Sequence, residues 1–273
     1  MNILIPIKQV PETSSVKMDE KSGVMIREGT ECIINPLDLY AVETGLQLKG
    51  KFGGSVTVIS MGPPSAEKAL KEAIAMGCDA GILLTGQEFA GSDTWATSYT
   101  ISETIKSIAG FDLIICGERA TDGDTGQVGP EIASMIDIPL ATYVSGIEAI
   151  DNEFIVVERL VESGYEKLKL SLPALLTVIK EIASPRLPTL RGKQRAKNTS
   201  IPVFSAAPLG IDKSKIGLLA SPTRVVKIET PKVTREGRII TVSSEPESIS
   251  KACDELLEFL EKQGLAPCPA TMG

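Results

Sequence analysis

A loop rich in small, acidic and hydroxyl residues, 117–128, has the composition of a nucleotide site. It follows an apolar stretch at 111–115 that predicts a buried strand, and it precedes a helical pattern at 131–136. Open α/β sheets bind nucleotides between the carboxyl end of a strand and the amino end of a helix. Free N–H groups in the first turn of such a helix can hold a phosphate, and glycines let the backbone approach it. Nucleotide binding is therefore the chemistry that these residues could perform.

The same loop matches neither standard phosphate motif. It lacks the Gly-Lys-Ser/Thr ending of a P-loop and the G-x-G-x-x-G spacing of a dinucleotide fold. Asp122 and Asp124 would repel a phosphate that they faced, so we expect them to cap backbone N–H groups or to accept bonds from ribose hydroxyls. From the local pattern alone, a purely structural strand–turn–helix junction is an equal alternative.

The composition excludes several kinds of chemistry. The 273 residues contain no histidine, so Ser-His-Asp and Cys-His catalysis and His-ligated metals are excluded, and we expect neither catalytic residues nor a metal. A net charge of −7 and only 4% aromatic residues argue against a nucleic-acid partner. The five cysteines are scattered, with no C-x-x-C pair, as expected of a reduced cytoplasmic protein. No apolar run reaches membrane-spanning length, so we expect no membrane insertion.

The first half of the chain alternates between patterns of strand and helix. Strands are predicted at 3–10, 55–60, 81–85 and 111–116, helices at 38–49, 65–76 and 93–109, and a short excursion of strands and turns at 24–34. This order predicts an α/β fold with a doubly wound, mostly parallel, Rossmann-like sheet that is covered on both faces. The carboxyl ends of its strands meet at one edge. Met61, Asp93 and the 117–128 loop would then line one crevice, which favours the nucleotide interpretation.

The pattern changes after about residue 140. Three alternating stretches predict an extension of antiparallel strands, followed by one more buried strand, at 143–150, 154–162, 165–172 and 175–179. The proline-rich stretch that follows predicts an extended C-terminal arm, and 248–263 predicts an amphipathic helix. We therefore divide the chain into a nucleotide-binding α/β domain at 1–183, the arm at 184–245, and the C-terminal helix and tail at 246–273. Because the arm has no core of its own, we expect a partner subunit to order it.

Part of the arm is strongly basic. Within this stretch, no acidic residue separates the five cations Arg186, Arg191, Lys193, Arg195 and Lys197. Such a run is either a solvated loop or a surface that docks an acidic partner or a phosphate.

Several short segments form a set whose order and spacing are specific. They are Ile5-Pro6-Ile7-Lys8-Gln9-Val10, Asn35-Pro36-Leu37-Asp38 followed by Ala41-Val42-Glu43, Ser60-Met61-Gly62-Pro63, residues 73–79, residues 117–130, Leu172-Pro173-Ala174-Leu175 and residues 185–190. Taken together, they resemble the beta subunit of electron-transferring flavoproteins over nearly the whole chain.

The resemblance implies a heterodimer. Its alpha subunit carries a mobile FAD domain, and its beta subunit holds a second adenine nucleotide, which is a structural AMP in conventional relatives and FAD in bifurcating and nitrogen-fixation-associated ones. The family's cofactor-binding positions correspond to Pro6, Asn35, Pro36, Leu37, Asp38, Met61, Gly117, Glu118, Arg119, Ala120, Thr121, Asp122, Gly123, Asp124, Thr125, Gly126, Gln127 and Val128.

The 117–128 loop looks like that of the FAD-binding branch. Conventional members tend to have a run of acids followed by an Asn-Gln-Thr-like triplet, whereas here Gly123 separates Asp122 from Asp124, and Gly126 leaves more room for a pyrophosphate. The resemblance then implies electron bifurcation: NADH is the substrate, and electrons pass to ferredoxin or flavodoxin and, through the alpha-subunit FAD, to a flavin dehydrogenase. That partner would act on an acyl-CoA, an enoyl-CoA-type substrate or lactate. NADH oxidation is expected only in complex with the alpha subunit.

Two alternatives stay open. One is a conventional electron carrier with AMP in this subunit, which exchanges electrons with an acyl-CoA dehydrogenase. The other is a stand-alone nucleotide-binding regulator, which should be stable without a partner.

The family's partner-docking loop maps onto residues 185–196. Leu190 stands where an apolar anchor enters a pocket of the dehydrogenase, and cations surround it. The docking residues that the resemblance implies are Arg186, Leu190, Arg191, Lys193 and Arg195. Arg159 matches an arginine that faces the mobile FAD domain, although a surface salt bridge is an equal alternative.

Overall fold

A computed structural model of the chain describes residues 1–12, 17–18, 25–26, 32–108, 110–224 and 239–264. The chain divides into two compact units, Met1–Ile228 and Glu229–Gly273. Most of the predicted excursion at 24–34, residues 225–238 of the predicted arm and the tail at 265–273 lie outside the described residues.

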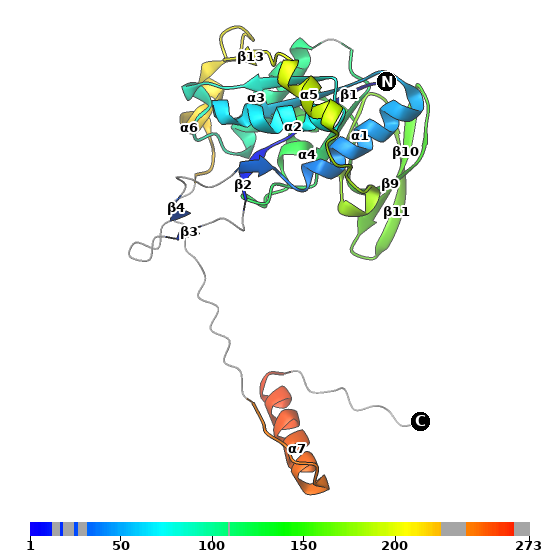
Figure 1. Cartoon of the computed structure of the whole chain (residues 1–273), viewed down its shortest axis with the longest axis vertical. Coiled ribbons are helices and arrows are strands. Elements are labelled where there is room, and N and C mark those ends of the chain that lie inside the picture. The colour runs from blue at the N-terminus through cyan, green and yellow to red at the C-terminus, as the bar shows by residue number, and fades with distance from the viewer. Residues whose placement is uncertain (13–16, 19–24, 27–31, 109, 225–238, 265–273) are drawn as a thin grey trace. The chain divides into compact units, whose positions relative to one another are not determined.

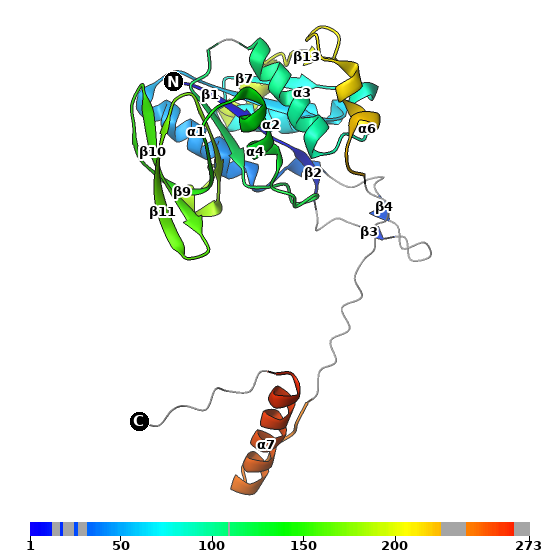
Figure 2. The same ribbon diagram turned by 180° about the vertical axis from the view of Figure 1, so that it is seen from behind.

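A nine-stranded sheet organises the first unit (Figures 1 and 2). Its strand order is β11-β10-β9-β12-β8-β1-β6-β7-β13. From β9 to β13 neighbouring strands are parallel, whereas β10 pairs antiparallel with β9 and β11. This arrangement confirms the predicted α/β class with an antiparallel extension. The strands are β1 (Asn2–Pro6), β6 (Ser55–Met61), β7 (Ala80–Leu84), β8 (Leu113–Gly117), β9 (Leu140–Ile150), β10 (Phe154–Val161), β11 (Gly164–Ser171), β12 (Ala174–Val178) and β13 (Val203–Phe204).

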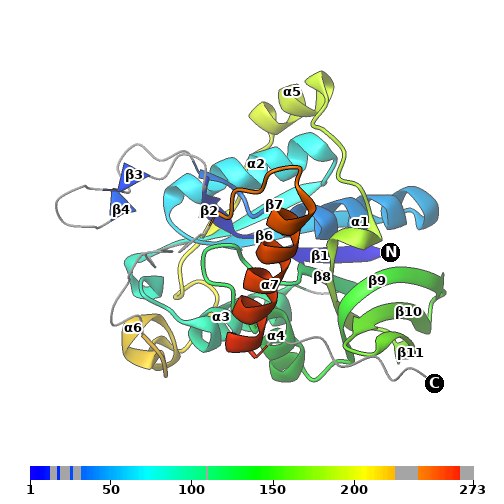
Figure 3. The same ribbon diagram turned by 90° about the horizontal axis from the view of Figure 1, so that it is seen from below.

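Helices cover both faces of the sheet, as Figure 3 shows. Helices α1 (Asp38–Phe52) and α2 (Glu67–Met76) lie on one side, and α3 (Thr94–Ser107) and α4 (Val128–Ile136) lie on the other. Successive residues of a strand point to opposite faces. Ile3 and Ile5 accordingly join the apolar cluster under α1 and α2, while Leu4 joins the cluster under α3 and α4. The central strands are therefore apolar on both faces, which is why they read as continuous hydrophobic runs.

The predicted strand at 3–10 is two strands. β1 ends at Pro6, and β2 (Gln9–Pro11) pairs with β5 (Cys32–Ile34) in a separate ladder. The break falls at Lys8, whose backbone N–H donates to the Asp38 carboxylate instead of to a neighbouring strand. A further short ladder joins β3 (Lys17–Met18) to β4 (Met25–Ile26).

The helix starts differ from the predicted ones in two places. Helix α2 begins at Glu67 rather than 65, because Ser65 lies in a 3-10 turn, η2 (Pro64–Ala66), which leads into the helix. Helix α4 begins at Val128 rather than 131, so the end of the candidate loop is its first helical residue. Asp93 caps α3, because its carboxylate accepts a hydrogen bond from Ala96 N at 3.1 Å.

The region after β12 adds short elements to the same unit. They are η4 (Lys180–Ile182), α5 (Leu190–Asn198), β13, η5 (Lys213–Lys215) and α6 (Gly217–Ala220), while η3 (Gln87–Phe89) precedes α3. Helix α5 packs on the outer side of α2 (Figure 3). Strand β13 pairs with β7 at the end of the sheet. Part of the predicted arm thus forms regular structure on the α/β body.

The second unit contains helix α7 (Pro246–Lys262), which matches the amphipathic helix predicted at 248–263. Its apolar residues Ile249, Leu256, Leu257 and Phe259 are exposed within the described residues.

Candidate nucleotide site at the carboxyl edge of the sheet

Three predicted binding residues end three neighbouring strands. Pro6, Met61 and Gly117 are the last residues of β1, β6 and β8. These strands are parallel, and β1 lies between the other two. The structure therefore brings the three residues to the same edge of the sheet, where open α/β folds bind ligands.

Asn35 joins the segment before α1 to the 117–128 loop. Its side chain is fully buried, its Nδ2 donates to the Arg119 carbonyl at 2.9 Å, and its Oδ1 accepts from Thr121 N at 3.1 Å. Its backbone N–H donates to the Lys8 carbonyl at 2.8 Å. Asn35 thus fixes the shape of the loop from beneath.

Asp38 lies at the centre of the same junction. Its Oδ2 accepts the backbone N–H of Lys8 at 2.7 Å. Burial raises the pKa of Asp38 to about 7, because desolvation outweighs the hydrogen bonds from Lys8 and Asn35 that favour the carboxylate. The carboxyl therefore exchanges its proton near neutral pH.

Gly117 permits the close contact between α1 and β8. A Cβ on this residue would lie 2.4 Å from Asp38 Oδ1 and 2.8 Å from the Leu37 carbonyl carbon. Only glycine leaves room for the start of α1 at this distance. Leu37 and Asp38 are therefore held directly against the end of β8, next to Pro36 and Asn35.

The loop itself pairs its acids with cations. Lys8 Nζ lies 2.7 Å from Asp122 Oδ1, and Arg119 Nε lies 3.0 Å from Asp124 Oδ1 and 3.6 Å from Glu118 Oε1. The two aspartates that would repel a phosphate are thus partly neutralised. Lys8 was not among the predicted site residues. Its position two residues after Pro6, in the same short motif, is the sequence signal that could have identified it.

The second half of the loop has an unusual backbone. Asp124 and Gly126 both have positive φ angles, 54° and 64°. Asp124 N donates to the Ala120 carbonyl at 2.8 Å, which closes a turn over residues 120–124. A Cβ on Gly123 would meet nothing within 4 Å, so the backbone there faces open space. Ala120 begins this turn, and Thr125 and Gly126 lie between the turn and Gln127, which precedes α4.

Hydroxyl groups of α3 form hydrogen bonds with side chains at the start of α4. Thr94 Oγ1 donates to Gln127 Oε1 at 3.4 Å and to Glu131 Oε1 at 3.2 Å, and Ser98 Oγ donates to Glu131 Oε2 at 2.8 Å. Val128, the last predicted site residue, lies between these contacts. The amino end of α4 is therefore fixed beside the loop, as a helix that binds a phosphate requires.

The predicted partner-docking residues are divided between two places. Leu190 and Arg191 begin α5, which also carries Lys193 and Arg195, and Leu190 is 87% exposed. Arg186, just before the helix, forms an ion pair with Glu43 of α1. Arg159 lies apart from them on β10, where its Nη1 is 3.3 Å from Glu166 Oε1 of β11. Its buried Nε has no hydrogen-bond partner among the described residues.

The described residues contain neither a cluster suited to a metal ion nor a helix suited to crossing a membrane. No group of three or more His, Cys, Asp or Glu side chains is placed to hold a metal ion within that part of the chain. Over the same residues, no helix combines the length and the apolarity that crossing a membrane requires.

Comparisons with known proteins agree with one another. The electron transfer flavoprotein domain family matches residues 22–209. The electron transfer flavoprotein subunit beta of Thermoanaerobacterium thermosaccharolyticum is 46% identical over 264 residues, which cover 96% of this chain and 99% of that protein. The caffeyl-CoA reductase-Etf complex subunit CarD of Acetobacterium woodii is 40% identical over 94% of this chain and 98% of its own length.

A third relative is the acryloyl-CoA reductase electron transfer subunit gamma of Anaerotignum propionicum. It is 38% identical over 94% of this chain and 98% of that protein. The chain therefore belongs to the electron transfer flavoprotein family, as a beta subunit.

Proposed function

We propose that this subunit binds FAD rather than AMP, and that with an alpha subunit it bifurcates electrons in the cytoplasm. NADH is the electron donor. One electron goes to ferredoxin or flavodoxin, and the other goes through the alpha-subunit FAD to a partner dehydrogenase. Membership of the family implies a flavin or AMP in this subunit, together with an alpha partner and a dehydrogenase. The choice of FAD and of bifurcation is the proposal.

The shape of the loop at Gly123 is the observation that carries the choice. The backbone at Gly123 faces open space, and the turn of residues 120–124 that contains it is closed by the bond from Asp124 N to the Ala120 carbonyl. A ligand that continues beyond its first phosphate needs such an unobstructed backbone. Residues 35–38, Met61 and the loop would hold the adenosine half, and the loop from Gly123 to Val128 would hold the pyrophosphate.

The ion pairs of the loop fit an anionic ligand. Lys8 and Arg119 reduce the repulsion that Asp122 and Asp124 would exert on a pyrophosphate. When bound, FAD supplies hydride acceptance and one-electron transfer, and the chain's own residues bind and orient it. Hydride transfer needs no acid or base from the protein, which agrees with a sequence that has no histidine.

Two of the relatives suggest the kind of dehydrogenase. Their names place them with a caffeyl-CoA reductase and an acryloyl-CoA reductase. By analogy, we propose that the partner of this chain is a flavin enzyme that acts on a CoA ester. Helix α5, with Leu190 exposed at its start, is the proposed docking element.

The cofactor content of the purified heterodimer tests the proposal. Extraction and chromatography should give two FAD and no AMP per heterodimer, and NADH should reduce the bound flavin. One FAD and one AMP would overturn the proposal in favour of a conventional carrier. A beta chain that purifies alone, stable and loaded with a nucleotide, would favour the stand-alone regulator.

A substitution in the loop tests the site itself. Gly123→Val places a branched side chain where a ligand would lie and should lower FAD occupancy. Gly50→Val in α1 is a matched control, because a Cβ there also meets nothing within 4 Å. Equal FAD occupancy in the two variants would remove the loop from the site.

A further inference from the structure

The basic run of residues 186–197 contains two arginines whose side chains bind the body of the subunit. Arg186 donates to Glu43 through its backbone N, Nε and Nη2, at 3.1, 2.7 and 2.9 Å. The Glu43 side chain is only 5% exposed. Burial alone would raise the pKa of Glu43, but the hydrogen bonds from Arg186 and Gln47 outweigh it and hold the pKa below its usual value. The ion pair therefore fixes the chain just before α5 to the side of α1.

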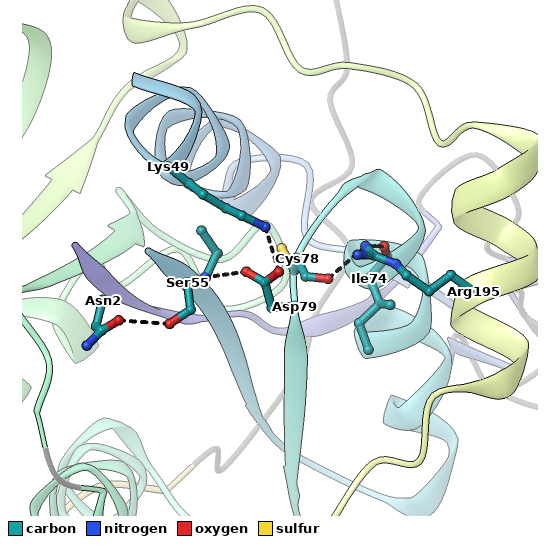
Figure 4. A network of polar contacts seen from close by, with 8 residues as sticks. Asn2, Lys49, Ser55, Ile74, Cys78, Asp79 and Arg195 are labelled. Atoms are coloured by element: carbon teal, nitrogen blue, oxygen red, sulfur yellow. Dashed lines mark hydrogen bonds and ion pairs between the residues drawn. The ribbon is translucent and has the colours of Figure 1, made fainter. Parts of the chain in front are cut away.

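Arg195 binds the carboxyl end of α2 (Figure 4). Its Nη2 donates to the carbonyl of Ile74 at 2.6 Å and to that of Cys78 at 2.9 Å. The last carbonyls of a helix have no partner within the helix and carry its negative dipole end. One guanidinium thus caps α2 from a helix more than a hundred residues away in sequence.

The end of α2 that Arg195 contacts is itself fixed. Asp79 accepts from Lys49 Nζ at 2.6 Å and from Val56 N at 2.8 Å, as Figure 4 shows for the side chains involved. These bonds tie the turn after α2 to α1 and β6. Arg195 is therefore anchored to a rigid part of the molecule.

Gly192 brings the backbone of α5 against α2. A Cβ on Gly192 would lie 2.0 Å from the Ala75 carbonyl oxygen. The end of α5 is also held, because Lys71 Nζ donates to the Thr199 carbonyl. Contacts before, within and after the helix thus fix its position.

Most other large side chains of this segment are exposed, although Lys193 lies near Glu72 of α2. Leu187 and Leu190 are 85% and 87% exposed, and Arg191 and Lys193 are exposed as well. Helix α5 has only nine residues and contains a glycine. An isolated helix shorter than about 12–15 residues is marginal in water. Its helical form therefore depends on the contacts with α1 and α2.

We propose that Arg186, Arg195 and Gly192 are positioning residues, which hold α5 in one orientation before a partner arrives. Leu187, Leu190 and Arg191 are the side chains left to contact the partner. The inference rests on the proposed docking role of α5, and it separates the basic run into residues that hold the helix and residues that face outward. A preformed helix lowers the entropy cost of docking.

Hydrogen exchange of the purified heterodimer tests the holding contacts without a partner. Arg195→Met and Glu43→Gln should speed the exchange of the α5 amides by about tenfold or more, because the helix opens locally. Amides of β8 and β12 should keep their protection. Arg195→Lys keeps the charge but replaces the planar guanidinium, whose Nη2 reaches both carbonyls, with a shorter side chain, so it should give an intermediate rate. Lys197→Met is the matched control and should leave α5 unchanged.

Electron delivery to a short-chain acyl-CoA dehydrogenase tests the consequence for docking. In Arg195→Met and Glu43→Gln, the KM for the dehydrogenase should rise severalfold, with kcat and the rate toward a small dye acceptor unchanged. Arg195→Lys should restore part of the loss. A purely structural defect would instead lower flavin content and the dye rate together.

Two outcomes would overturn the inference: unchanged exchange of α5 in both variants, or faster exchange with an unchanged KM. If Arg195→Met does not fold, Arg195→Lys and Glu43→Gln decide the question. Failure of the docking proposal looks different, because then Leu190→Ala would leave the KM unchanged while the exchange results stood.

Discussion

Side-chain hydrogen bonds hold both the candidate nucleotide site and helix α5 to the rest of the first unit, but the side chains differ in length and burial. At the candidate nucleotide site these side chains are short and buried. Asn35 bonds to backbone groups of the 117–128 loop, and Asp38 accepts the backbone N–H of Lys8. At α5 the side chains are those of Arg186 and Arg195, which are long and partly exposed. Their guanidinium groups bond to Glu43 and to the Ile74 carbonyl. We therefore expect the buried side chains to contribute mainly to the free energy of unfolding, and the exposed arginines to set mainly the orientation of α5.

The largest effect is expected from Asn35→Ala. The change leaves the Arg119 carbonyl and Thr121 N–H without their partner and opens a cavity, which should cost roughly 3–5 kcal/mol of unfolding free energy and empty the nucleotide site. Urea unfolding and extracted nucleotide measure the two effects. Asn152→Ala, in an exposed turn, is the control. A variant with normal nucleotide content would show that Asn35 does not shape the loop.

The next effect concerns pH. The folded-state pKa of Asp38 is raised to about 7 from 3.8, so between these values the native state holds a proton that the unfolded state has lost. Stability from this group is therefore present at low pH and is lost as the pH rises from about 4 to about 7, by up to about 4 kcal/mol. Asp38→Asn keeps an oxygen acceptor for Lys8 N and should lack this loss.

Unfolding of the wild type and Asp38→Asn, measured at several pH values, checks this prediction. The curves should diverge as the pH rises through 4–7, and parallel curves would contradict it. Asp151→Asn is a contrasting control, because hydrogen bonds from Phe154 N and Glu153 N lower the pKa of Asp151. The stability that the Asp151 carboxylate contributes should instead be lost as the pH falls.

At α5 the comparison predicts a loss of function without a loss of stability. Leu190 is 87% exposed, so Leu190→Ala should leave the melting temperature and the flavin content unchanged. If the residue is a docking anchor, the KM for the dehydrogenase should rise on the order of tenfold or more. Steady-state electron transfer measures this change. Reduced flavin content would instead assign Leu190 to the fold.

The smallest effect should come from Lys8→Met. Lys8 is half exposed, so the loss of its ion pair with Asp122 should change stability by less than about 1 kcal/mol. The unpaired Asp122 should nevertheless weaken nucleotide binding severalfold at low salt and less at high salt. Titration of the apoprotein with FAD at two salt concentrations tests this expectation. Equal weakening at both would exclude an electrostatic cause.

The sequence was sufficient to predict the sheet, its antiparallel extension and the edge at which Met61 and the 117–128 loop lie. Those features follow from hydrophobic periodicity and from the geometry of parallel strands. The break at Lys8 could not be predicted, because it depends on a carboxylate that lies thirty residues along the chain. For the same reason, the pairing of Arg186 with Glu43, 143 residues apart, is visible only in the folded chain.

Helix α5 itself was missed within the predicted arm. The stretch has several prolines and a glycine, and its helical form depends on Arg195 and on contact with α2. Apart from Gly192 and Asn198, the residues of α5 are good helix formers, so local propensity favours a helix here, and the surrounding prolines led to the prediction of an extended arm. The sequence itself showed the charged residues around Leu190, and the resemblance implied their docking role, but which of them bind the body of the subunit needed the structure.

Arg186 and Arg195 would depend on different groups if residues 185–198 were transferred into a related beta subunit. Arg195 bonds to main-chain carbonyls, which any relative with an equivalent of α2 provides whatever its sequence. Arg186 needs the carboxylate of Glu43, a side chain on another helix. A chimera that exchanges residues 185–198 to change the partner enzyme must therefore carry position 43 with it, whereas the rest of α1 can stay with the host.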